Sequence, residues 1–191
     1  FIYEQKIWIT VSLNAKEDEQ KIFDSINSTG EPLNATDIIK NALFDKTIKT
    51  IGETEATEWY KKYWGNIFEK DNDERNFWNK KTTIGRIKRA KSEIFFHAFA
   101  IIEGFFDPNK HNLQNISLLY KEYTKNFGEQ ELKNFFENIL KYSEIYRQFP
   151  IYNKKSLFSF EKWEDRFFHI IEQTKTNTVL PLILILKYRL N

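Results

Sequence analysis

The sequence predicts a mainly α protein, a multi-helix array preceded by one β-strand and two helices. Residues 6–13, KIWITVSL, alternate between apolar and other side chains, which is the pattern of a strand with one buried face. From residue 55 onward, apolar side chains recur at helical spacing almost everywhere. The chain is 41% hydrophobic and contains 18 Phe, which is enough apolar material for a packed core and argues against disorder.

The strand at residues 6–13 needs hydrogen-bonding neighbours, because an isolated strand leaves its backbone groups unpaired. No later segment alternates as cleanly. We therefore interpret residues 1–50 as the end of a truncated α/β domain, whose other strands lie upstream or in another chain. Residues 51–191 then form a helical domain of their own.

Two helices are predicted between this strand and residue 50. The first begins after Asn14 and ends at Gly30, a residue that suits the left-handed conformation of a helix terminus. The second begins at Asn34, an N-cap residue with Asp37 three positions later. Its predicted apolar face consists of Ile38, Ile39, Ala42 and Leu43.

The helices predicted after residue 50 are defined by apolar stripes. These stripes cover residues 59–68, 84–102, 118–123, 132–146, 163–171 and 178–190, with a loop at 107–112 around Pro108. The longest apolar run, VLPLILIL at 179–186, falls short of the roughly 20 residues that span a bilayer. We interpret it as a buried core helix and expect no membrane contact.

Charge and composition exclude several kinds of site. The net charge is +2, so attraction to nucleic acid requires a local patch. The absence of Cys excludes disulfides and thiolate zinc sites, and it fits a cytoplasmic location. His97, His111 and His169 do not show ligand spacing, so we predict no metal site and no catalytic residues in this chain.

A basic cluster lies in NKKTTIGRIKRAKSE, residues 79–93, where no acidic residue occurs before Glu93. A local cluster of this kind can neutralise several phosphate charges, which predicts a nucleic-acid contact. The alternative is a solvated helix face, because helical periodicity would spread these charges around the axis. The candidate nucleic-acid-binding residues are Lys80, Lys81, Arg86, Lys88, Arg89 and Lys91.

One segment, IFDSINSTGEPLNATDIIKNALF at residues 22–44, resembles a known family. It is similar to the signature near the end of the N-terminal, ParB/sulfiredoxin-like domain of GmrSD-type restriction proteins. The resemblance rests on Ile22, Phe23, Asn27, Ser28, Gly30, Pro32, Leu33, Asp37, Ile39, Lys40 and Asn41. It is tight over about 40 residues.

The resemblance implies that residues 1–50 are the C-terminal remnant of a nucleotide-handling domain. Phe23 and Asn27 match the family's Phe-x-x-x-Asn element, which would lie beside the nucleotide. In a functional interpretation of Asn-Ser-Thr-Gly, Asn27, Ser28 and the backbone before Gly30 border a phosphate or base. A second interpretation of Asn-Ser-Thr-Gly remains open, namely an ordinary helix C-terminus with Gly30 in the turn. The family's Asp-Gly-Gln-Gln-Arg motif and an HNH pattern are both absent from this sequence.

The implied function is therefore that of a non-catalytic part of a larger bacterial phage-defence protein. Residues 51–191 would couple the upstream nucleotide-binding domain to a nuclease domain or subunit, or to a DNA-sensing module. We expect no cofactor in this fragment, while the parent protein would use a nucleoside triphosphate and a divalent metal. The alternatives are a stand-alone nucleic-acid-binding module using residues 80–91 and a protein-interaction scaffold.

Overall fold

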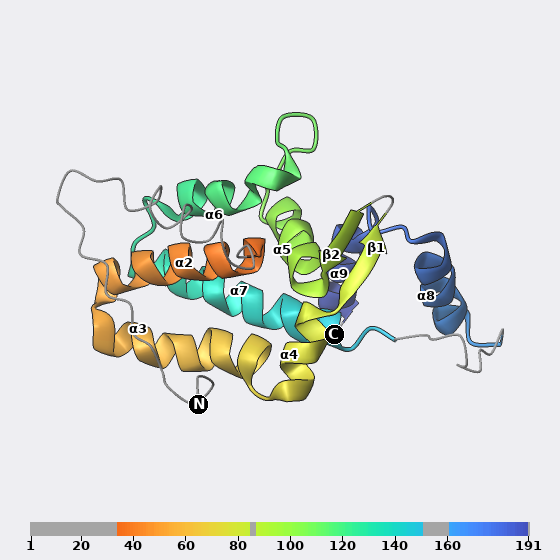
Figure 1. Cartoon of the computed structure of the whole chain (residues 1–191), viewed down its shortest axis with the longest axis horizontal. Helices are drawn as coiled ribbons and strands as arrows, with labels where there is room; N and C mark the ends of the chain where they lie inside the picture. The colour runs from red at the N-terminus through yellow and green to blue at the C-terminus, as the bar shows by residue number, and fades with distance from the viewer. Residues whose placement is uncertain (1–33, 85–86, 151–160, 191) are drawn as a thin grey trace, which may run out of the picture. The chain divides into compact units, whose positions relative to one another are not determined.

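The computed structural model describes residues 34–84, 87–150 and 161–190. Within these ranges the chain forms eight α-helices, a π-helix, a short 3-10 helix and one two-stranded antiparallel sheet (Figure 1). The prediction of a mainly α fold is confirmed. The strand predicted at residues 6–13 and the helix predicted before Gly30 lie outside the described residues.

The elements follow one another in the order that Figure 1 labels. They are α2 (Ala35–Ile51), α3 (Glu53–Tyr60), η1 (Lys61–Glu69), α4 (Asn72–Asn79), β1 (Lys81–Ile84), β2 (Ile87–Ala90), α5 (Lys91–Ile102), η2 (Leu113–Asn115), α6 (Ile116–Thr124), α7 (Glu129–Arg147), α8 (Trp163–Thr174) and α9 (Leu180–Leu190).

Helix α2 begins where its capping residues predict. The Asn34 side chain accepts a hydrogen bond of 2.9 Å from the Asp37 backbone N–H, which satisfies one of the free donors of the first turn. A compact unit begins at Asn34, and α2 packs in it mainly against α6 (Figure 1). The sequence pattern groups this helix with residues 1–50, whereas within the described residues it contacts the helices that follow it.

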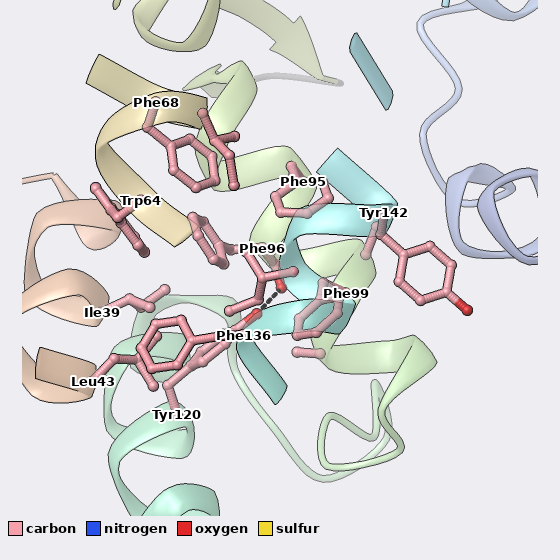
Figure 2. Close-up of a cluster of buried hydrophobic side chains, with 14 of the residues drawn as sticks. Ile39, Leu43, Trp64, Phe68, Phe95, Phe96, Phe99, Tyr120, Phe136 and Tyr142 are labelled. Atoms are coloured by element: carbon pink, nitrogen blue, oxygen red, sulfur yellow. Dashed lines mark hydrogen bonds between the residues drawn. The ribbon is translucent and has the colours of Figure 1, made fainter. Parts of the chain in front are cut away.

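The core is built from aromatic side chains of several helices, and Phe96 of α5 lies near its centre (Figure 2). Its ring lies 5.5 Å from Trp64, 5.4 Å from Phe68 and 5.6 Å from Tyr120, measured between centroids. The Tyr120 hydroxyl donates a 2.7 Å hydrogen bond to the Phe96 carbonyl oxygen. Helix α7 adds a fully buried stripe of Leu132, Phe136 and Ile139.

The stripe predicted at residues 59–68 forms two consecutive helices, α3 and the π-helix η1. At the end of η1, Glu69 accepts three hydrogen bonds. The Tyr60 hydroxyl donates at 2.6 Å, the Lys40 ammonium at 3.0 Å and the Trp64 indole at 3.2 Å. Burial raises the pKa of Glu69, but these donors outweigh it and hold the pKa below its ordinary value. Burial and the Glu69 contact raise the pKa of Tyr60 to about 12.

The helix predicted over residues 84–102 is wrong in its first part. Residues 81–84 and 87–90 form an antiparallel hairpin, and α5 begins only at Lys91. The segment TTIGRI places two β-branched Thr and two Ile around Gly85, a composition that favours a hairpin with a two-residue connection. Ile84 and Ile87 match a helical stripe by spacing alone, so periodicity could not separate the two structures.

The C-terminal helices are less buried than the sequence predicts. In α9, Leu180, Ile183 and Leu184 are buried, but Leu182 is 58% exposed and Leu186 is 49% exposed. The interpretation of residues 179–186 as a buried core helix therefore holds for one face of α9. In α8, Phe168 is buried, whereas Trp163 is 78% exposed.

Candidate nucleic-acid interface

The basic cluster lies mainly on the two-stranded sheet, which we name the basic ribbon and define as residues 81–84 and 87–90. The register pairs Lys81 with Ala90, Thr82 with Arg89 and Thr83 with Lys88. Because side chains alternate between the faces of a strand, Lys81 and Lys88 share one face, and Arg89 lies on the other. Lys81 and Lys88 are diagonal neighbours across the pair, a relationship that puts side chains about 7–8 Å apart.

The root of the basic ribbon is fixed to the helical unit by hydrogen bonds. The Lys91 backbone N–H donates to the Lys80 carbonyl at 3.1 Å, which closes the hairpin. Glu93, in the first turn of α5, accepts from the Ala90 backbone N–H at 3.1 Å through Oε2. Its Oε1 accepts from the Ala35 backbone N–H at 3.4 Å.

Glu93 therefore joins the end of β2 to the first turn of α2. A second contact lies beside it, because the buried hydroxyl of Thr36 donates to the Ser92 hydroxyl at 3.0 Å. In the sequence, Glu93 is only the residue that ends the basic run. Its position three residues after Ala90, where an acidic side chain can accept from the N-cap backbone, is the signal that could have identified it.

The cations of the basic ribbon, and Lys80 beside it, carry no acidic partner in the described part of the chain. Lys80, Lys81 and Lys88 are exposed, and Arg89 is half-buried. Elsewhere in the described ranges, some cations form ion pairs, as in Lys40–Glu69, at 3.0 Å, and Lys49–Asp45, at 2.7 Å. An unpaired cation on a rigid strand retains its full charge for an external phosphate.

Arg89 lies close enough to His97 for its charge to act on it. Burial, with a smaller contribution from the Arg89 charge, lowers the pKa of His97. The His97 ring lies edge-on against Phe106, with centroids 4.7 Å apart. His97 is therefore held neutral near physiological pH, and it does not add to the positive charge of the ribbon.

The structure does not bring all six predicted cations together. Arg86 lies outside the described residues. Lys91 is the first residue of α5, and its ammonium lies over the Phe77 ring, 4.1 Å from the centroid. Lys80, Lys81, Lys88 and Arg89 therefore form the described basic surface, and Lys91 lines a cavity beside it.

The predicted nucleotide-binding residues Phe23, Asn27, Ser28 and Gly30 lie outside the described residues, and their role stays a prediction. Among the described residues, no group of three or more His, Cys, Asp or Glu side chains is placed to hold a metal ion. The described helices include none with the length and apolar character needed to cross a bilayer.

Comparison of the chain with protein-family models, curated proteins and solved structures finds no match.

Proposed function

We propose that residues 34–190 contact nucleic acid through the basic ribbon. The observation that carries this proposal is a rooted two-stranded hairpin bearing Lys81, Lys88 and Arg89, none of which has an acidic partner among the described residues. The major groove of B-DNA, about 12 Å wide, admits a two-stranded ribbon. Lys80 at the root adds a fourth cation next to the same strand.

The ribbon side chains favour phosphate contact over base recognition. Lys is a flexible point charge, and Arg and Lys supply most of the salt-dependent affinity of nucleic-acid-binding proteins. Ile87, which is 55% exposed, adds an apolar side chain near the ribbon tip. Such a surface binds with little sequence preference and positions the backbone of the duplex.

We further propose that this unit belongs to a GmrSD-like, modification-dependent restriction protein of phage defence. The support is the segment at residues 22–44 together with the mainly helical unit that follows it. Glu93 supplies a physical link for coupling, since it bonds the ribbon root to the first turn of α2, directly after residues 1–33. A change in residues 1–33 that displaced this turn would alter the support of the ribbon.

The same proposal predicts that the purified chain has no catalytic activity by itself. Purified protein is expected to hydrolyse no nucleoside triphosphate and to leave duplex DNA intact in the presence of Mg²⁺. The reason is that the sequence lacks the Asp-Gly-Gln-Gln-Arg and HNH motifs of the family. Phosphate release and gel assays of DNA cleavage measure both activities, and sustained turnover by homogeneous protein contradicts this assignment.

Replacing Lys81, Lys88 and Arg89 together by Gln tests the ribbon directly. Fluorescence anisotropy with a labelled duplex is expected to show binding by the natural protein at about 50 mM salt. The triple variant should bind at least about tenfold more weakly, because each lost cation removes a phosphate contact.

A matched control replaces three exposed lysines by Gln. They are Lys121 of α6, Lys133 of α7 and Lys125 of the turn between these helices. This variant has the same net charge as the ribbon variant and should bind like the natural protein. Equal losses in the two variants would show a general charge effect and would refute the ribbon as the contact site.

A protein-interaction scaffold is the second candidate, favoured by the exposed apolar side chains of α8. Trp163, Phe167 and Ile170 are 78%, 41% and 51% exposed, and their spacing puts them along one stripe of the helix. Exposed apolar patches mark interaction sites in many soluble proteins. This function predicts that the anisotropy assay shows weak binding that does not depend on salt.

A further inference from the structure

A cavity of about 130 Å³ lies beside the root of the basic ribbon, between α4 and α5 on one side and α7, α8 and α9 on the other. Its wall is mostly apolar and includes Phe77, Ile94, Tyr146, Phe168, Leu180 and Ile183. A cavity of about 150 Å³ with such a lining accommodates benzene. The space therefore suits one small aromatic or branched aliphatic group.

Of the charged side chains that line the cavity, Lys91 is the most buried. Its ammonium lies on the Phe77 ring, 4.1 Å from the centroid, and has no hydrogen-bond acceptor or ion-pair partner among the described residues. Burial is the main cause that lowers the pKa of Lys91 to about 8, and the Lys80 ammonium lowers it further. A desolvated cation of this kind gains more from an anionic partner than an exposed lysine does.

Besides burial, the charges of Lys80 and Arg147 lower the pKa of Lys91, and the charge of Glu172 raises it. Arg147 lies over the same Phe77 ring, at 4.2 Å, but its Nε donates to both carboxylate oxygens of Glu74, at 3.0 and 3.1 Å. Glu172 lines the cavity and favours the charged form of Lys91, but its side chain is exposed to solvent. Lys175 also lines the cavity, so the groups facing it are positive on balance.

We propose that this cavity binds a small organic monocarboxylate that carries one aromatic or branched apolar group. The carboxylate accepts hydrogen bonds from the Lys91 ammonium, and the apolar group packs against Phe77, Phe168 and Ile183. Lys91 supplies the charge and the cavity wall supplies the apolar contact, so both parts of the ligand are required. This site does not depend on nucleic-acid binding by the ribbon.

Benzoate and its neutral analogue benzyl alcohol test the proposal by titration calorimetry and ligand-observed NMR on the whole chain. The natural protein is expected to bind benzoate at least about tenfold more tightly than benzyl alcohol at pH 7, because the alcohol cannot neutralise the ammonium. In Lys91→Met, which keeps an unbranched apolar side chain, benzoate binding should fall at least tenfold while benzyl alcohol binding stays. Lys121→Met is the matched control and should bind benzoate normally.

A pH titration of the natural protein provides a test that needs no variant. Benzoate affinity should fall about tenfold between pH 7 and pH 9, because Lys91 loses its proton through its pKa of about 8. An ordinary lysine, with a pKa near 10.4, would leave the affinity almost constant over this range. Any one of three results would overturn the proposal. These are a benzoate affinity that does not change with pH, equal binding of benzoate and benzyl alcohol, and no benzoate binding at millimolar concentration.

Discussion

Phe96→Ala is expected to lower the free energy of unfolding by about 3–5 kcal/mol, the range for removing a buried aromatic ring. Phe96 is fully buried, and its ring lies within 5.6 Å, between centroids, of Trp64, Phe68, Phe95 and Tyr120 (Figure 2). These neighbours come from η1, α5 and α6, so the cavity left by Ala cannot close by the shift of one helix. Urea denaturation followed by circular dichroism measures the loss.

Trp163→Ala is the matched control for this substitution. Trp163 is 78% exposed, so truncation should change the free energy of unfolding by less than about 0.5 kcal/mol. Both variants remove a large aromatic side chain, but they differ in burial. Losses of similar size would contradict the position of Phe96 at the core centre.

Glu69→Ala is expected to lower the free energy of unfolding by about 2 kcal/mol, less than Phe96→Ala. The change leaves the Tyr60 hydroxyl, the Lys40 ammonium and the Trp64 indole without their acceptor. A charged hydrogen bond contributes about 1.5–3 kcal/mol. The expected loss is smaller than the sum of three such bonds, because Glu69 is partly open to solvent and its ion pair with Lys40 is screened.

The same group gives a pH dependence with a definite sign. The folded state holds the pKa of Glu69 below its unfolded value, so the unfolded state binds more protons in that interval. The stabilisation by Glu69 is complete above the unfolded pKa, near 4.3, and is lost as the pH falls through the folded pKa. Urea denaturation between pH 3 and pH 6 should show this loss in the natural protein and a smaller one in Glu69→Gln. Identical profiles would contradict the role of the Glu69 charge.

The elements that sequence predicts well are those with a local cause. Asn34 and Asp37 lie within one turn of each other, so the start of α2 depends on residues that are neighbours in the chain. The same is true of α7, whose stripe from Leu132 to Tyr146 is read from its own spacing. In α7 most of the predicted face is buried, whereas in α2 Ile39 and Leu43 are buried and Ile38 and Ala42 are only partly buried.

The basic ribbon could not be predicted because its cause is partly non-local. Ile84 and Ile87 fit a helical period as well as a hairpin, and α5 follows without a break. Glu93 fixes the start of α5 by accepting hydrogen bonds from the backbone N–H groups of Ala90 and Ala35. Ala90 ends β2 and Ala35 begins α2, which is far away in the sequence. The change from helix to hairpin also alters the interface, because alternation along the strand places Arg89 on the opposite face from Lys81 and Lys88.

Lys91 shows the same limit within the candidate site. In the sequence it is one of six clustered cations, and spacing gives no reason to separate it from Arg89. Its environment is set by Phe77 of α4 and by residues of α8 and α9, which lie far along the chain. Only the tertiary fold divides the basic run into an exposed ribbon and a cavity-lining amine.

The salt dependence of duplex binding tests the central claim most directly, namely that the ribbon cations replace counterions on phosphates. Log Kobs should fall linearly with log salt for the natural protein, by about 0.9 for each phosphate contacted. For the variant with Gln at positions 81, 88 and 89, the slope should be smaller in magnitude by up to about 2.7, which corresponds to three contacts. If the two proteins bind with the same slope, the ribbon does not contact phosphate and the account is wrong.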